Sequence, residues 1–285
     1  MDIKFDAALK QILDPKNPNE CRPVPFWSWN SRLEPEELVR QVNQLYESGH
    51  GGFIMHARMG LETEYLGEEW MRCIEVCCKE AKHLGMQAWI YDENGWPSGF
   101  VGGKLLSEPR FRARYLTMQE KTAFDETAFA VFEKKNGRFR RLREKEHGEN
   151  YFCVYCKSSS SNTDILNAEY VGNVIKGFFT DEPQYYRTET PFTPALVKDF
   201  RELYGEDVRD GLIYLFFHDE KGYLFRWRYY SLLHRYYIEN YYKKLYDWCD
   251  AHGCMLTGHS IEESCLYGQM WGSGGVAETY AFEHM

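Results

Sequence analysis

The first third of the chain alternates short apolar segments with longer amphipathic ones. Each apolar segment ends in polar residues, and the three segments lie at residues 23–30, 51–56 and 87–91. Between them, apolar residues recur every three or four positions, as in Leu38, Val42 and Leu45. The two amphipathic runs stop at Gly49 and Gly85, and glycine commonly ends helices. The pattern predicts buried strands joined by helices, and therefore right-handed βαβ units in a parallel sheet.

A different pattern follows residue 110. Residues 115–157 show the alternation typical of strands, and Asn136-Gly137 favours a two-residue hairpin turn between two of them. We therefore predict a small β-rich insertion at residues 111–172, placed in a loop after the third strand.

The alternation of strand and helix resumes after this insertion. Further strands are expected at residues 177–181, 255–259 and 279–283, and helices at 194–204 and 224–251. Eight βα units close a barrel, and this pattern supplies about six. We predict an α/β fold of the TIM (β/α)8 type, truncated after about strand 6, with the barrel at residues 1–110 and 173–285. An open barrel would expose sheet edges, through which two chains could associate.

Polar residues gather at the predicted C-terminal ends of these strands. In βα barrels those ends meet at one mouth, which carries the catalytic groups. The mouth would contain Trp29, Asn30, His56, Arg58, Asp92, Glu93, Trp96, Asp181, Glu182, His259 and Glu262, with Glu283 at a sixth strand end. Paired carboxylates beside aromatic rings favour glycoside hydrolysis. There, one carboxylic acid protonates the leaving oxygen, and a second carboxylate activates water or attacks the sugar.

The fourth predicted strand ends in two adjacent acids. Pro183 stops the strand directly after Asp181 and Glu182. Glu182 is our candidate for the catalytic acid, with Asp181 beside it in the catalytic set. The alternative is that Asp181 braces a loop and Glu182 only lies at the rim of the cleft. Glu262 is the candidate for the carboxylate that activates water.

Residues 92–99 form a turn rich in glycine and proline that points to substrate binding. Trp96 in this turn can offer a flat face to a sugar ring, and the neighbouring acids can contact substrate or a metal. The alternative is a helix start capped by Ser98, with Trp96 packed inside. The complete set of predicted substrate-binding residues is Trp29, Asn30, His56, Arg58, Asp92, Glu93, Trp96 and His259. For His56, a hydrogen-bonded place in the core is an equal alternative.

Composition narrows the class of partner. Aromatic residues make up 16% of the chain, which fits a cleft for carbohydrate, and the net charge of −9 argues against nucleic acid. The apolar runs are too short to cross a bilayer, so no membrane partner is expected. The first residues lack the basic and apolar regions of a signal peptide, which leaves the localisation open.

Five segments resemble the barrel of glycoside hydrolase family 106, the α-L-rhamnosidases and related enzymes that act on plant polysaccharides. The segments are Pro25-Phe26-Trp27-Ser28-Trp29-Asn30, Gly52-Phe53-Ile54-Met55-His56-Ala57-Arg58, Tyr91-Asp92-Glu93-Asn94-Gly95-Trp96-Pro97-Ser98-Gly99, Phe179-Thr180-Asp181-Glu182-Pro183 and Thr257-Gly258-His259. They run in order from about residue 23 to the end of the chain. The Trp-Pro-Ser-Gly and Thr-Asp-Glu-Pro parts are the most specific.

The resemblance implies a (β/α)8 barrel and an inverting mechanism with two glutamates, of which Glu182 would be one. It also implies calcium at the site of many members, and no organic cofactor. Family members are much longer and carry β-sandwich domains. Two other functions therefore stay open. One is a carbohydrate-binding remnant without turnover. The other is a metal-dependent hydrolase of another substrate, in which His56 and His259 would hold zinc.

Overall fold

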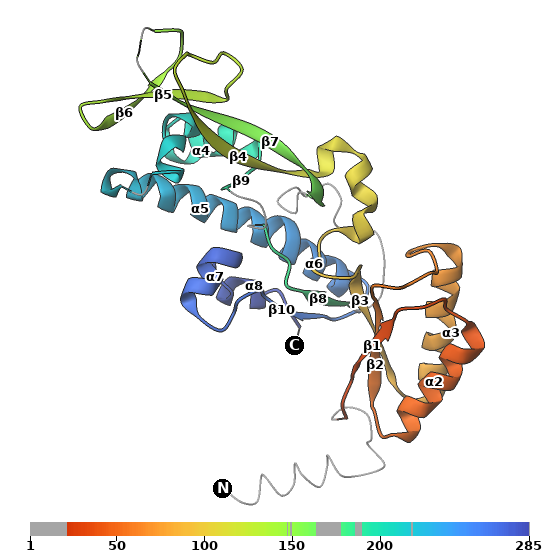
Figure 1. Cartoon of the computed structure of the whole chain (residues 1–285). Helices are drawn as coiled ribbons and strands as arrows, with labels where there is room; N and C mark the ends of the chain where they lie inside the picture. Colours follow the sequence, from red (N-terminus) through yellow and green to blue (C-terminus); the bar gives the residue numbers. More distant parts are fainter. Residues whose placement is uncertain are drawn as a thin grey trace, which may run out of the picture.

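The computed structural model describes residues 22–146, 148, 150–163, 178–185, 190–217 and 219–284. Figure 1 shows two sheets joined by helices. A parallel sheet lies beside the first two helices, and a twisted antiparallel sheet lies along the long helix of the C-terminal half. The end of the predicted insertion, residues 164–172, falls outside the described residues.

Five parallel strands form the first sheet. They are β1 (Phe26–Trp29), β2 (Gly52–Ala57), β3 (Gln87–Asn94), β8 (Phe178–Asp181) and β10 (Leu256–His259). They lie side by side in this same order, and every neighbouring pair is parallel. The predicted parallel sheet of successive units is therefore confirmed.

Helices cover one face of this sheet. They are α2 (Pro35–Glu47) and α3 (Glu68–Leu84), which pack on β1 to β3, and α6 (Lys243–Ala251), which packs on β8 and β10. Proline fits the first turn of α2, and α3 ends where Gly85 adopts a φ of 68°. Phe53 and Trp70 are almost fully buried in this layer. Each such side chain stabilises the fold by about 1.5–3 kcal/mol.

The opposite face of the parallel sheet carries a row of rings that leads toward the strand ends. Phe26, His56, Tyr91 and Phe179 lie next to one another, and the rings of His56 and Tyr91 stack with centroids 3.5 Å apart. Phe26 is 50% exposed, so solvent reaches this face at the outer strand. The row therefore runs from a solvent-accessible ring, Phe26, to the buried rings of His56 and Tyr91, next to the edge where the polar residues were predicted to gather.

The second sheet is antiparallel. Its strands are β4 (Arg112–Lys121), β5 (Ala130–Lys135), β6 (Arg138–Leu142), β7 (Tyr151–Thr163) and β9 (Thr190–Phe192), in the order β6-β5-β7-β4-β9. The hairpin at Asn136-Gly137 is present, and both residues have positive φ, as this turn requires. Because β9 follows β8 in the chain, this sheet also uses residues beyond the predicted end of the insertion at 172.

The antiparallel sheet packs on a helical layer rather than standing alone. That layer contains α4 (Ala195–Tyr204), α5 (Tyr223–Tyr237) and the short turns η4 (Val208–Asp210), η5 (Leu212–Leu215) and η6 (Glu220–Gly222). A π-helical segment, η7 (Ile238–Tyr242), joins α5 to α6, so one long helix spans both sheets. The shorter helices are η1 (Val101–Ser107), η2 (Pro109–Phe111), α7 (Leu266–Gly272) and α8 (Ala277–Tyr280).

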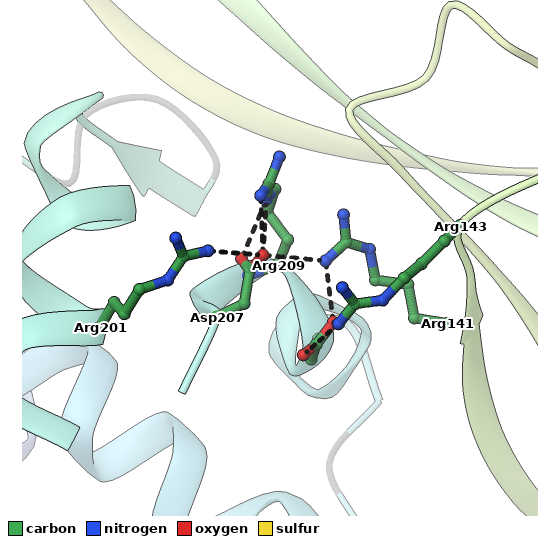
Figure 2. A network of polar contacts seen from close by, with 6 residues as sticks. Arg141, Arg143, Arg201, Asp207 and Arg209 are labelled. Atoms are coloured by element: carbon green, nitrogen blue, oxygen red, sulfur yellow. Dashed lines mark hydrogen bonds and ion pairs between the residues drawn. The ribbon is translucent and has the colours of Figure 1, made fainter. Parts of the chain in front are cut away.

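An arginine–aspartate network fastens the edge strand β6 to this layer. Figure 2 shows its members, Arg141, Arg143, Arg201, Asp207, Arg209 and, unlabelled, Asp210. Arg141 donates to Asp210 at 2.8 Å and lies 3.4 Å from Asp207. The hydrogen bonds from Arg209 hold the pKa of Asp207 well below its usual range. The network joins β6 to η4 across a long sequence separation.

Two features of the predicted barrel differ from the structure. The parallel sheet has five strands in the described part of the chain and is not closed, because β1 and β10 are its outer strands; a TIM barrel is not shown. The predicted sixth strand at residues 279–283 is wrong, since α8 covers its start. The N–H of Tyr280 donates to the carbonyl of Val276, as in a helix. A five-residue apolar alternation is too short to separate strand from helical turn.

Candidate active site

The ends of β8 and β10 bring three of the predicted residues together. Asp181 and His259 are the last residues of these strands and are partners in the strand register. The Nε2 atom of His259 lies 2.8 Å from Asp181 Oδ1 and 4.0 Å from Glu182 Oε1. The strands approach closely because Gly258 lies opposite Thr180. A Cβ atom on Gly258 would overlap the Thr180 carbonyl oxygen.

Glu182 has a strained backbone and a neighbour at each carboxylate oxygen. Its φ of 48° lies in the left-handed region, which costs a residue other than glycine about 1–2 kcal/mol. Its N–H donates to the His259 carbonyl at 3.0 Å, and the indole N–H of Trp96 donates to Oε2 at 2.8 Å. Backbone strain of this kind gathers at functional sites. The loop after β3 and the end of β10 together fix the Glu182 side chain.

The other ring nitrogen of His259 faces a second group of acids. Glu263 Oε1 lies 3.7 Å from Nδ1, and the Tyr280 hydroxyl donates to Oε2 of the same carboxylate. Burial, together with the charge of Glu263, raises the pKa of Glu283 to about 7, although the Gly258 N–H acts in the opposite direction. The imidazole ring of His259 therefore separates Glu182 from Glu263, whose charge also acts on Glu283.

Asp181 is held by donors on both of its oxygens. The Tyr91 hydroxyl donates to Oδ2 at 2.7 Å, and His259 faces Oδ1. Its backbone is also tied to the loop after β3, because the N–H of Ser98 donates to the Asp181 carbonyl and the Asp181 N–H donates to Ser98 Oγ. Asp181 thus orients His259 and anchors a loop.

Glu93 is buried and turned toward the backbone of its own loop. Its carboxylate accepts four N–H groups, from Asn94, Phe100, Val101 and Gly102, at 2.5 to 2.8 Å. Burial raises the pKa of Glu93, while these four donors act in the opposite direction. The carboxylate thereby shapes the loop that carries Trp96.

Asp92 lies behind the same loop. The Ser98 hydroxyl donates to its Oδ1, and Thr180 is a second hydrogen-bonding partner. Burial raises the pKa of Asp92 to about 7, against the effect of these two hydroxyls. Asp92 and Glu93 both hydrogen-bond to this loop, and its Trp96 side chain is 46% exposed and so available to a ligand.

The other predicted residues lie in three different settings. Trp29 is buried and packs edge-on against Trp27 and Trp70. His56 is buried as well; burial lowers its pKa to about 4, and its Nε2 lies 3.4 Å from the Gly95 carbonyl. Asn30, Arg58 and Glu262 are exposed. The core alternative for His56 therefore matches its surroundings, and Glu263 rather than Glu262 adjoins His259.

The described acids do not fit a calcium or zinc site. Calcium needs six to eight oxygen ligands that converge on one point. Here the oxygens of Asp92, Glu93 and Asp181 face hydroxyl, N–H and imidazole groups of the protein. Across residues 22–284, wherever the structure describes them, no group of three or more His, Cys, Asp or Glu is arranged to hold a metal.

Sequence reasoning missed three residues of this site: Tyr91, Glu263 and, as a ligand of Asp181, Ser98. Glu263 lies four positions after His259, a spacing that brings side chains together on a helical turn. Tyr91 looks like one more apolar residue of a buried strand, although its hydroxyl needs a partner. Of the three residues, only Glu263 carried a usable signal, namely its spacing from His259.

No profile of a known protein family matches this chain, and no curated protein sequence is similar to it. Among solved structures, a rhamnosidase from Novosphingobium sp. PP1Y is similar, with a TM-score of 0.66 over 96% of this chain and 11% sequence identity. The fold of this chain is therefore similar to that of part of the rhamnosidase. The match covers 48% of the rhamnosidase, so this chain spans about half its length. Membership of glycoside hydrolase family 106 stays a prediction.

The part of the chain that the structure describes contains no helix long and apolar enough to span a membrane.

Proposed function

We propose that this chain carries the catalytic carboxylates of a glycosidase that acts on α-L-rhamnosides by inversion, as in glycoside hydrolase family 106. The observation that carries the proposal is the group of carboxylates around His259, at the C-terminal ends of adjacent parallel strands. The similarity of fold to a rhamnosidase supports the same class of substrate.

Glu182 is the proposed acid. In the reaction it donates a proton to the glycosidic oxygen as the bond to the sugar breaks. The indole N–H of Trp96 fixes one oxygen of this carboxylate and leaves the other on the side of His259. Asp181 and His259 then bind sugar hydroxyls beside the breaking bond.

The second carboxylate activates the water that attacks the anomeric carbon from the opposite side. Inverting enzymes keep the two carboxyl groups about 6.5–9.5 Å apart, which leaves room for this water. Glu263 lies across the His259 ring from Glu182 and is the candidate that the geometry favours. Glu283, whose carboxyl is influenced by the charge of Glu263, is the second candidate. Glu262, the sequence candidate, is exposed one residue away and enters the same test.

The test is hydrolysis of 4-nitrophenyl α-L-rhamnopyranoside by the purified chain and its variants. A general acid contributes about 10²–10⁴ in rate, so Glu182→Gln should lower kcat/KM at least about 100-fold. Glu262→Gln, Glu263→Gln and Glu283→Gln identify the second carboxylate. Glu69→Gln, on the exposed side of α3, is the matched control.

Proton NMR of the first product decides the stereochemistry. Inversion gives the β-anomer of L-rhamnose before mutarotation. Sugar binding without turnover would replace the proposal by the carbohydrate-binding alternative. Activity that a chelator abolishes and zinc restores would replace it by the metal-dependent one. Elemental analysis of the purified chain checks the calcium that the resemblance implies.

A further inference from the structure

A pocket of about 270 Å³ lies next to the proposed acid. The loop after β3 forms most of its wall, and the end of β7 contributes Ser161 from the antiparallel sheet. The residues that this loop and its flanks contribute include Glu93, Asn94, Trp96, Pro97, Phe100 and Leu106. Figure 1 shows how the lower end of β7 reaches the helical turns that follow β3. The volume approaches the lower end of the range for small-molecule sites, about 300 Å³, and suits one sugar ring.

Trp96 connects this pocket to the reacting carboxylate. Its ring lines the pocket, while its indole N–H donates to Glu182 Oε2 at 2.8 Å. The other oxygen of Glu182 faces His259, beyond which lies Glu263. The proton donor thus has the pocket on one side and the proposed water-activating carboxylates on the other.

We infer that this pocket binds the sugar on the leaving-group side of the scissile bond. The inference rests on the proposed function. The attacking water must come from the side of the second carboxylate, so the rhamnose ring lies on the His259 side of Glu182. The glycosidic oxygen faces Glu182, and the next sugar then falls against Trp96 and Phe100.

The lining selects a neutral sugar. It includes the aromatic rings of Trp96 and Phe100, which can pack on the apolar face of a pyranose, and the amide of Asn94, which can bind a hydroxyl. Among the described residues that line it, none is a Lys, Arg or His that could pair with an acidic sugar. Glu93, the acid among these described residues, would repel a uronate carboxylate whenever it is ionised.

The pocket is also preformed. Glu93 holds the loop through four hydrogen bonds, and Ser98 ties the same loop to the end of β8. A site that needs no ordering on binding keeps more of its interaction energy as affinity. The second sugar should therefore increase affinity measurably.

Calorimetric titration tests the inference in the Glu182→Gln background, which prevents turnover. An α-L-rhamnosyl-D-glucose disaccharide should bind at least about tenfold more tightly than L-rhamnose, equivalent to about 1.4 kcal/mol. The matching disaccharide with D-glucuronate in place of glucose should lose this advantage. Adding Ser161→Trp, which fills the pocket from β7, should make the affinity for the rhamnosyl-glucose disaccharide about equal to the affinity for L-rhamnose. Leu106→Trp fills the pocket from the opposite wall and should act alike.

Ser160→Trp is the control, because Ser160 is exposed next to Ser161 and does not line the pocket. It should leave the ratio of the two affinities unchanged. The inference is overturned if the parent protein binds both sugars equally, if it binds neither, or if filling the pocket leaves the ratio intact. Hydrolysis of the aryl rhamnoside by the unmodified chain tests the proposed function separately. If the chain hydrolyses the aryl rhamnoside but filling the pocket leaves the ratio of the two affinities unchanged, only the assignment of the pocket is refuted. If filling the pocket changes this ratio but the chain does not hydrolyse the aryl rhamnoside, only the proposed catalysis is refuted.

Discussion

Replacement of Asp92 by asparagine should stabilise the protein at alkaline pH. The Asp92 carboxyl lies behind the loop that carries Trp96, with the hydroxyls of Ser98 and Thr180 as its partners. Burial raises its pKa from 3.8 to about 7, so the folded protein holds this proton over a range where the unfolded chain has lost it. Asparagine resembles the protonated form at every pH.

The sign and size follow from linkage. Where the folded state binds more protons than the unfolded state, stability falls as pH rises. The cost is absent below about pH 4, grows through the interval up to pH 7 and is complete above it. The pKa of Asp92 differs by about three units between the folded and unfolded states, and each unit corresponds to ~1.4 kcal/mol, so the loss of unfolding free energy is ~4 kcal/mol. Water at the accessible edge of Asp92 makes this an upper bound.

Urea unfolding of Asp92→Asn and the parent protein at several values between pH 4 and pH 8 measures the effect. The difference in unfolding free energy should move in favour of the variant with rising pH, by up to ~4 kcal/mol over the range. Taking the difference cancels other titrating groups, such as Glu283. A constant difference, or one that moves in favour of the parent, would refute the reasoning.

Four further outcomes are expected. Glu93→Gln should cost about 1.5–3 kcal/mol in urea unfolding, because the NH2 end of the amide cannot accept the two N–H groups that one carboxylate oxygen accepts; an unchanged midpoint would contradict this. Burial lowers the pKa of His56 from 6.5 to about 4, so stability is lost as pH falls through that interval; His56→Phe should remove that loss from the unfolding curves. Tyr91→Phe should lower kcat more than it changes KM, because the hydroxyl positions Asp181; an equal effect on both would argue against this role. Light scattering should detect self-association through the outer strands near the exposed Phe26; a monomer at high concentration would exclude it.

The sequence predicts where residues gather better than what each one does. Short apolar runs that alternate with amphipathic runs ending at Gly49 and Gly85 are sufficient to predict successive βα units, because few other arrangements bury such segments. Parallel strands end at one edge, so the meeting of Asp181, Glu182 and His259 follows from the strand assignment alone. The topology of the sheet thus brings Asp181, Glu182 and His259 together.

The remaining roles depend on which partner a polar atom finds. Glu93 was predicted to bind substrate; its carboxylate accepts N–H groups of the loop after β3 and also lies in the wall of the neighbouring pocket. His56 was placed at a strand end, yet its ring stacks on Tyr91 in the core. The surroundings of Glu93 and His56 depend on loop conformation and on the packing of rings between strands. Neither of these produces a periodic pattern in the sequence. The wrong strand at 279–283 has the same origin, since short runs carry little periodic signal.

Gly258 limits how this site can change under selection. Any larger residue there would push against the Thr180 carbonyl and move β10 away from β8. The distance between Asp181 and His259 would then increase, even though neither residue had been altered. In a mutational library selected for altered sugar preference, position 258 should therefore tolerate no substitution, while the walls of the neighbouring pocket accept many. New sugar specificities would then arise from substitutions among the residues that line the pocket, while the pairing of β8 with β10 stays unchanged.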